Sequence, residues 1–273
     1  MLTSMIARRS DYAKVARLCR RAVGPRDYVL SELDHVIDDG RLFLAFEGKE
    51  LVGISHLTEL LDNIGWLGMA RTDPDWRGKG VAQFLQRNIA TYERKRGIKR
   101  LRMFILETNT SSIRAVQKGG FKPVCDVSYV SRRVKRASKT QPITSNRPSI
   151  QSLPKSQYVS VLNGYFGYGW QILRASRDVF KKIVDKDSIY MGHGTTILFT
   201  NVKESQDDLQ AFTLLDGPVG KGLKQAIEIG SQLGCKYVGT FLPYDLRAIK
   251  TAKKLGFLQS SWGWHMVVFE KKI

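Results

Sequence analysis

Cysteine is scarce in this chain of 273 residues, which holds only Cys19, Cys125 and Cys235. The three lie far apart in no metal-ligand spacing, and the four histidines form no metal pattern either. Three scattered cysteines argue against a disulfide framework and are typical of proteins kept in a reducing compartment. We therefore expect a cytoplasmic protein without disulfide bonds and without a bound metal.

Long apolar segments are also lacking. No stretch approaches the roughly 18 consecutive apolar residues that indicate a membrane-spanning helix. Residues 1–9 lack the apolar centre of a secretory signal. With 42% hydrophobic residues, the chain is long enough for two modest globular domains. We expect no membrane partner.

Acidic residues are also few. The chain contains 25 Asp and Glu residues and 44 Lys and Arg residues, which gives a net charge of +19. Residues 131–155 contain seven basic residues, three prolines and no acidic or aromatic residue, a composition typical of a linker. The basic excess suits an anionic cofactor or an acidic partner such as nucleic acid or a ribosome, and a solvated basic surface explains it equally well. Any nucleic-acid contact through this linker is expected to be weak, because no aromatic ring is present for base stacking.

The stretch from Trp66 to Ala82 is the most informative about function. Its first half has a strand pattern that ends before Pro74, because proline has no N–H and a restricted φ. A loop with two glycines and two cations follows, and from Val81 apolar residues recur at helical spacing. Such a loop at a helix N-terminus suits phosphate, because free amide groups and the helix dipole favour an anion.

The spacing within this loop narrows the choice of ligand. It matches neither the G-x-x-x-x-G-K-[ST] pattern of a P-loop nor the G-x-G-x-x-G pattern of a dinucleotide fold. It does contain Arg-x-x-Gly-x-Ala, at Arg77, Gly80 and Ala82. After a second strand pattern, residues 109–121 run from Asn-Thr-Ser-Ser to Lys-Gly-Gly-Phe. The two segments resemble, in this order, the pyrophosphate-binding motif and the second signature of the GNAT superfamily of acetyl-CoA-dependent N-acyltransferases.

The resemblance implies how acetyl-CoA is bound. Backbone groups of the strand are expected to pair with the pantetheine arm, the loop to hold the pyrophosphate, and the second helix to touch the pantetheine. The implied cofactor-binding residues are Ala70, Arg71, Thr72, Arg77, Gly78, Lys79, Gly80, Val81, Ala82, Asn109 and Ser112. The side chain of Arg71 points either to the cofactor or to the acceptor, and the sequence leaves both directions open.

Two departures from the family pattern leave the catalytic acid and base unassigned. Val116 stands where many relatives carry a tyrosine acid, and Trp66 stands where some carry a glutamate base. Nearby ionisable residues supply the candidates, which are His56, Glu59, Asp62 and Tyr129. His56 is equally a half-buried strand residue and Glu59 a solvated loop carboxylate.

The second half of the chain repeats the first. Residues 245–257 align with residues 109–121 at a constant offset of 136, and the Gly-Lys-Gly of residues 220–222 echoes the loop of the first half. Similarity over a domain length indicates duplication. The copy has Val219 in place of Arg77 and begins its second helix with aspartate instead of asparagine. We expect it to keep the fold and lose the cofactor.

The fold class that follows is α/β (α+β), with two tandem GNAT-like domains that are each a mixed, mostly antiparallel sheet flanked by helices. Residues 1–133 are expected to bind acetyl-CoA and carry out catalysis, residues 134–155 to form a basic linker, and residues 156–273 to form a degenerate copy. Because related domains often pair as dimers, a fused copy predicts a monomer that is an internal pseudo-dimer.

The function that the resemblance implies is acetyl-CoA-dependent N-acetyl transfer to a primary amine of a small molecule or a protein. The alternative is a non-catalytic coenzyme A-binding protein that acts as a basic RNA- or ribosome-binding module.

Overall fold

The computed structural model of the chain describes residues 1–135, 149–185, 187–204, 209–259 and 264–273. Most of the predicted linker, residues 136–148, lies outside the described residues. The chain forms two compact units. The first comprises Met1–Met103, Asn109–Lys122 and Phe269–Ile273, and the second comprises Phe104–Thr108 and Pro123–Val268.

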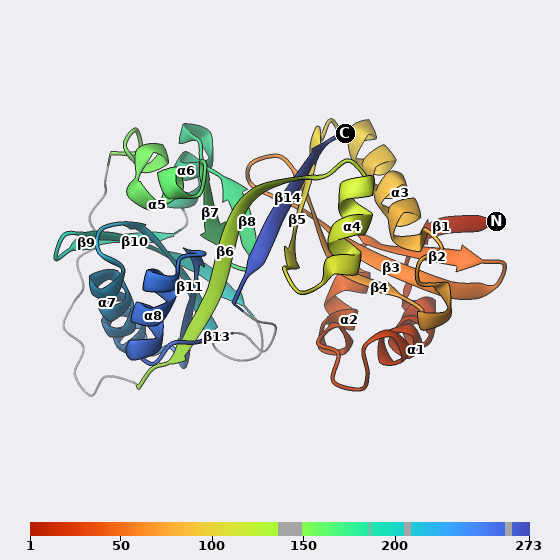
Figure 1. Ribbon diagram of the computed structural model, residues 1–273, viewed down its shortest axis with the longest axis horizontal. Coiled ribbons are helices and arrows are strands. Elements are labelled where there is room, and N and C mark those ends of the chain that lie inside the picture. Colours follow the sequence, from red (N-terminus) through yellow and green to blue (C-terminus); the bar gives the residue numbers. More distant parts are fainter. Residues whose placement is uncertain (136–148, 186, 205–208, 260–263) are drawn as a thin grey trace. The chain divides into compact units, whose positions relative to one another are not determined.

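The first half of the chain supplies most of the first unit (Figure 1). Its elements are β1 (Leu2–Ile6), α1 (Tyr12–Ala22), α2 (Val29–Asp38), β2 (Leu42–Glu47), β3 (Glu50–Glu59), β4 (Gly65–Thr72), α3 (Val81–Lys95), β5 (Arg100–Leu106) and α4 (Thr110–Lys118), with 3-10 turns at Arg9–Asp11 and Pro74–Trp76. The strands are ordered β1-β2-β3-β4-β5. All neighbours are antiparallel except β4 and β5, which are parallel.

The second half builds a sheet of the same plan. Its elements are β6 (Lys122–Arg133), a 3-10 turn (Leu153–Lys155), α5 (Gln157–Val161), β7 (Tyr165–Tyr168), β8 (Gln171–Arg174), α6 (Arg177–Val184), β9 (Ser188–Gly192), β10 (Thr195–Glu204), β11 (Leu209–Asp216), α7 (Val219–Gln232), β12 (Tyr237–Pro243), α8 (Leu246–Lys254), β13 (Leu258–Gln259) and β14 (Met266–Lys272). The order β9-β10-β11-β12 repeats β2-β3-β4-β5, again with one parallel pair, β11 and β12. The expectation of mixed, mostly antiparallel sheets flanked by helices is confirmed.

The two halves of the chain exchange their last strands. Strand β6 follows β5 and α4 in the chain, yet from Pro123 onward it belongs to the second unit, where it pairs with β12. The end of β14, Phe269–Ile273, belongs to the first unit and lies beside β5. Each unit therefore contains residues from both halves of the sequence, a feature that the sequence-based ranges 1–133 and 156–273 do not anticipate.

Apolar periodicity places a core on the sheet of each unit. In the first, α1 and α2 bury Val15, Leu18, Leu33 and Val36 against β2 and β3, in keeping with the helical spacing of these residues. In the second, α7 and α8 cover a cluster that includes Phe199, Phe212 and Phe257. Within the described part of the chain, no helix combines the length and apolar character needed to cross a membrane.

A buried ion-pair network joins the C-terminal strand to the first unit. Arg102 on β5 is 0% exposed, and its Nε and Nη2 donate to Glu270 Oε2 at 3.0 and 2.6 Å. Its Nη1 donates to Asp62 Oδ2 at 2.8 Å, and Arg100 also donates to Glu270. Burial alone would raise the pKa of Glu270, but the two guanidinium groups hold this pKa below its ordinary value.

Replacing Glu270 by alanine is expected to lower the free energy of unfolding by about 3 kcal/mol, because the buried Arg102 loses one of its two carboxylate partners. Since the pKa of Glu270 is lowered by folding, its contribution is present at neutral pH and is lost as pH falls through that pKa. Urea unfolding at pH 7 and at acid pH measures both effects. Lys272→Ala, an exposed change on the same strand, is the control, and equal stability of the two variants would contradict the assignment.

Candidate functional site

The centre of β4 carries a β-bulge. His56 on β3 pairs with Gly68, and Ile54 pairs with Arg71, so that two residues of β4 lie opposite one residue of β3. The first of the two, Met69, has a φ of 53°, which is unusual for a residue with a side chain. Bulges of this kind bend a strand and redirect its backbone groups, and they are frequent next to active sites. The predicted cofactor residue Ala70 is the second residue of this bulge.

Strands β4 and β5 separate shortly after they begin. The parallel pairing is confined to Gly65 with Leu101 and Trp66 with Arg102. From Leu67 to Thr72, no described strand pairs with the edge of β4 that faces β5. An unpaired strand edge offers N–H and C=O groups to an extended ligand.

The loop after β4 presents a second set of free backbone groups. Gly78 and Gly80 have φ values of 77° and 81°, a region that glycine enters without strain, and Gly80 is the N-cap of α3. The amide groups of Gly78, Gly80, Val81 and Ala82 donate no hydrogen bond within the part of the chain that the structure describes. Free amides at the start of a helix of 15 residues are suited to an anion, and this is the loop for which the sequence predicts phosphate binding.

The two cations of the loop have different surroundings. The guanidinium Nη2 of Arg77 donates to the carbonyl oxygen of Ala22 at 2.7 Å, which ties the loop to the C-terminus of α1. Lys79 is exposed, with its Nζ 4.7 Å from the ring centroid of Trp76. Lys79 therefore remains available to a ligand, whereas Arg77 already has a structural partner.

The direction of the Arg71 side chain is decided by the tertiary structure. Its Nε and Nη2 donate to the buried carboxylate of Asp27 at 2.7 and 2.6 Å, and its guanidinium carbon lies 5.2 Å from the ring centroid of Tyr28. Asp27 and Tyr28 lie in the connection between α1 and α2. The Arg71 side chain therefore anchors that connection, while its backbone stays at the bulge.

Asn109 and Ser112 lie together at the N-terminus of α4. Asn109 Oδ1 accepts hydrogen bonds from the backbone N–H of Ser112 at 3.2 Å and from Ser111 Oγ at 3.1 Å, so Asn109 is the N-cap of this helix. Val116, which replaces the family's tyrosine, is buried. The Asn109 amide nitrogen remains available for a ligand contact.

A cavity of about 200 Å³ lies between α3 and α4 in the first unit. Its lining residues are Gln83, Gln86, Arg87, Leu101, Lys118, Gly119, Phe121 and Lys271. Gln83 is one residue beyond the loop, so the cavity adjoins the free amide groups. The buried Gln86 Oε1 has no hydrogen-bond partner among the described residues. Three cations and no carboxylate line this space, which suits an anionic group.

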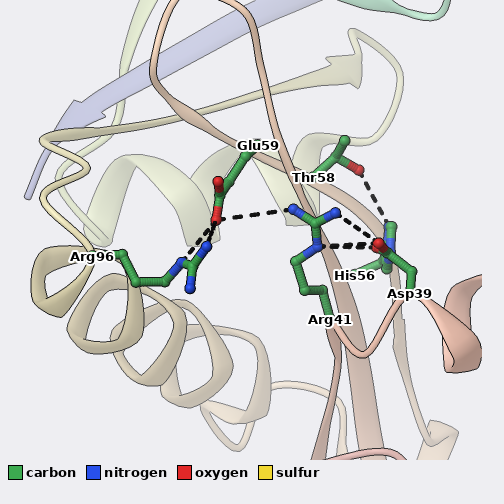
Figure 2. A network of polar contacts seen from close by, with 6 residues as sticks. All are labelled: Asp39, Arg41, His56, Thr58, Glu59 and Arg96. Atoms are coloured by element: carbon green, nitrogen blue, oxygen red, sulfur yellow. Dashed lines mark hydrogen bonds and ion pairs between the residues drawn. The ribbon is translucent and has the colours of Figure 1, made fainter.

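His56 belongs to a polar network that extends from Asp39 after α2, through Arg41 and Glu59, to Arg96 after α3 (Figure 2). Its Nε2 lies 3.0 Å from Asp39 Oδ2, and Arg41 Nη2 donates to Asp39 Oδ1 at 2.6 Å. Arg41 Nη1 also lies 3.9 Å from Glu59, which accepts from Arg96 at 2.8 Å. The Asp39 carboxylate therefore orients the imidazole and is itself fixed by a guanidinium group.

Burial and charge act in opposite directions on this pair. Burial lowers the pKa of His56 below its ordinary 6.5, and the neighbouring Asp39 offsets only part of the shift. Burial would raise the pKa of Asp39, but hydrogen bonds from Arg41 and His56 hold it below its usual value. A Cβ placed on Gly68, the cross-strand partner of His56, would meet no atom within 4 Å. A neutral imidazole thus borders open space at the bulge.

The remaining candidates for acid or base are occupied or packed. Glu59 is paired with Arg96, and Asp62 accepts from the buried Arg102. Tyr129 belongs to the second unit, where its ring packs at 4.1 Å from Trp170 and 5.0 Å from Phe241, measured between centroids. Of the candidates in the first unit, His56 is the one that lies beside the bulge.

The sequence did not single out Asp39 or Glu93. Asp39 follows α2 and has no local signal that links it to His56. Glu93 is 0% exposed, and neither of its oxygens has a hydrogen-bond partner among the described residues. Burial, with the nearby Glu59, raises its pKa. Its place on the buried face of α3, four residues after Ile89, is the sequence signal that could have found it.

The second unit lacks the features of the loop. Gly220 and Gly222 lie inside α7 without positive φ, so the Gly-Lys-Gly echo is helical there. Strands β11 and β12 also separate after three residue pairs, but β7 contacts both of them. Thr213 Oγ1 donates to the carbonyl oxygen of Gly167, and a Cβ on Gly167 would lie 2.8 Å from Phe241 Cβ. The protein itself covers this region of the second sheet.

Comparison with solved structures gives the class of fold. The chain is similar to a GCN5-related N-acetyltransferase from Sphaerobacter thermophilus, with a TM-score of 0.60 at 14% identity over 99% of this chain and 95% of that one. A candidate acetyltransferase from Pyrococcus horikoshii gives a TM-score of 0.60 at 12% identity, over 100% and 89% of the two chains. One from Thermoplasma acidophilum gives 0.58 at 16% identity, over 97% and 89%. Identities this low show the fold alone.

The sequence itself gives the family. Residues 11–121 match the model of the Acetyltransferase (GNAT) family, and no curated protein sequence matches the chain. Residues 11–121 therefore form a domain of the GNAT acetyltransferase family, whose members use acetyl-CoA. This region spans β4, the glycine loop and the whole of α4. Among the described residues, no group of three His, Cys, Asp or Glu side chains is placed to hold a metal ion.

The electrostatics of His56 can be measured directly. By NMR titration, His56 is expected to have a pKa below 6.5, and Asp39→Asn is expected to lower it further because the carboxylate stabilises the imidazolium form. Asp38→Asn, which changes an exposed carboxylate paired with Arg9, is the matched control and should leave the titration unchanged. A His56 pKa at or above 6.5 would contradict the proposed environment.

Proposed function

We propose that the first unit transfers an acetyl group from acetyl-CoA to a primary amine of a small molecule or a protein, in the cytoplasm. The observation that carries this proposal is the alignment of three features along one chain segment. These are the bulge at Met69 and Ala70, the unpaired edge that runs to Thr72, and the four free amides from Gly78 to Ala82.

The residues present suit the coenzyme along its length. The free amides and Lys79 suit the pyrophosphate, and the edge formed by Ala70, Arg71 and Thr72 offers backbone groups to the two amides of the pantetheine arm. Arg71 Nη1 also donates to the Ala70 carbonyl oxygen at 3.0 Å, a contact that the arm would share. Asn109 and Ser112 add polar groups from the second helix. The cations of the adjoining cavity, Arg87, Lys118 and Lys271, suit the third phosphate. When bound, acetyl-CoA supplies an activated acyl group as a thioester.

His56 is the residue that we assign to proton removal from the acceptor amine. With Asp39 accepting the Nε2 hydrogen, Nδ1 keeps its lone pair, and Thr58 Oγ1 lies 3.5 Å from it. Because burial keeps the imidazole neutral, it is in the basic form at neutral pH. An amine in the open space over Gly68 lies next to this ring.

Backbone groups contribute the second element of catalysis. Amide N–H groups on the free edge of β4 donate to a carbonyl oxygen held there and stabilise negative charge that develops on it. Val116 has no proton to donate, so we assign protonation of the leaving group to water. The second unit is not assigned a coenzyme, because its glycines are helical and β7 covers the diverging strands.

An acetyl-CoA consumption assay over a panel of amines tests the proposal. The wild-type chain should consume acetyl-CoA, and Gly80→Ala should lose most coenzyme affinity because its backbone conformation costs about 1–2 kcal/mol for a residue with a Cβ. Gly97→Ala is the matched control, since Gly97 has a φ of 83° beyond the other end of α3. It should show the same loss of stability with unchanged coenzyme affinity.

His56→Gln separates binding from turnover in the same assay. It should bind coenzyme A as the wild type does and turn over slowly. If the wild type binds the coenzyme but turns over no amine, a non-catalytic, RNA- or ribosome-binding role is favoured. If Gly80→Ala and Gly97→Ala bind the coenzyme equally well, the glycine loop is not part of the coenzyme site.

Calorimetric titration is expected to give one coenzyme A per chain, with the chain monomeric in sedimentation. One coenzyme per chain is expected because the second unit has no glycine loop at the start of α7 and because β7 covers its diverging strands. A matched measurement uses Gly222→Ala, which alters α7 in the second unit at a glycine packed against Leu214. It should leave the stoichiometry at one, and two sites per chain would show that the second copy also binds the coenzyme.

A further inference from the structure

The outer surface of α1 carries a shallow groove of about 570 Å³ that the assigned site does not use. All of its lining residues come from this one helix, and they are Tyr12, Ala13, Ala16, Arg17, Arg20 and Arg21. Helical spacing arranges them in two neighbouring rows, one through residues 12, 16 and 20 and the other through residues 13, 17 and 21. The groove therefore has an aromatic ring at one end, small residues in the middle and guanidinium groups at the other end.

The positive charge of this groove is largely uncompensated. Helix α1 contains four cations and no acidic residue. Arg21 is paired with Asp73 and Asp75, but Arg17 and Arg20 form no ion pair with any carboxylate in the described ranges. Cations in the last turn of a helix interact favourably with the negative end of the helix dipole. This explains the presence of Arg20 and Arg21 even if no ligand binds there. Arg17 lies in the middle of the helix and is not explained in this way.

The composition of the groove favours nucleic acid over an acidic peptide. Tyr12 is 37% exposed, and its ring is the part on which a base can stack. Ala13 is exposed and has no long side chain, so a flat base can approach the helix beside the ring. Guanidinium groups bind phosphate with two parallel hydrogen bonds and also stack on bases. A carboxylate-rich peptide would use the cations alone.

We propose that this groove binds single-stranded nucleic acid, with Arg17 and Arg20 on consecutive phosphates and Tyr12 stacked on a base. The net charge of +19 strengthens the attraction of any polyanion at long range. The groove does not include the residues assigned to the coenzyme, although Arg21 at its end pairs with Asp73 and Asp75 just before the glycine loop. Arg132, at the end of β6 just before the predicted basic linker, already donates to the carbonyl oxygen of Leu255, and residues 136–148 of the linker lie outside the described residues.

Fluorescence anisotropy with a labelled uridine oligonucleotide, on the full chain, tests the proposal. The double variant Arg17→Gln/Arg20→Gln should raise Kd about tenfold or more at about 50 mM salt and reduce the slope of log K against log salt by about 1.4. Tyr12→Ala should weaken binding at least about fivefold, whereas Tyr12→Phe keeps the ring and should bind as the wild type does. A thymidine oligonucleotide distinguishes RNA from DNA as the source of the strand.

The matched control is Arg94→Gln/Lys95→Gln, which removes the same charge from exposed positions of α3 in the same unit. It should change Kd much less than the α1 variant does. Equal losses for the two double variants would show that only net charge matters, and an absence of binding at low salt would also overturn the proposal. If a polyglutamate peptide binds as tightly as the oligonucleotide, and if this binding also depends on Arg17 and Arg20, the groove is instead a site for acidic proteins. Circular dichroism of each variant checks that the fold is retained.

Discussion

The separation of β4 from β5 is the constraint on which the site of this protein depends. Backbone N–H and C=O groups inside a sheet need partners, and these two strands supply them to each other over only two residue pairs. Beyond Trp66, the bulge at Met69 bends β4. The loop that follows β4 contains four more amide groups that donate no hydrogen bond within the described residues. A row of unpaired polar groups in the middle of a domain is tolerated where water or a ligand satisfies them. In the second unit, β7 packs on the corresponding region, so the protein itself covers the diverging strands there.

Buried charges hold the surroundings of this opening in place. Arg71 and Arg102 are both largely removed from solvent, and each is matched by buried carboxylates, Asp27 for the first and Asp62 with Glu270 for the second. A buried guanidinium group without its partner would be strongly unfavourable, so these pairs fix the segments that carry them. Arg71 fixes the connection of α1 and α2, and Arg102 fixes the end of the C-terminal strand. That strand comes from the other half of the sequence, so the first unit is complete only in the full chain.

The chemistry assigned to His56 follows from position more than from residue type. A histidine on a strand is commonly a satisfied, half-buried residue. Here the His56 ring lies opposite Gly68, where the absence of a side chain leaves open space. Asp39 forms a hydrogen bond with one of the two ring nitrogens of His56, Nε2. Arg41 in turn keeps Asp39 ionised, so the imidazole is oriented by a fixed negative charge (Figure 2).

The sequence by itself determined what depends on neighbouring residues along the chain. The strands and helices around the first glycine loop, the loop itself and the repeat of residues 109–121 in residues 245–257 follow from local spacing and backbone preference. These features are encoded within short segments, so the pattern of residue types is enough to find them, and the loop in turn indicates the class of ligand.

Only the tertiary structure decided which distant groups meet. It directed Arg71 to Asp27 and Arg77 to the end of α1, paired His56 with Asp39, buried Glu93 and exchanged the last strands. It also placed Gly220 and Gly222 inside a helix, although the same three residues form an open loop in the first half. Such outcomes depend on packing between segments far apart in the sequence, where several partners of the right charge compete. Local residue preferences do not distinguish among those partners, because the free energy that selects one of them arises only when the core has formed.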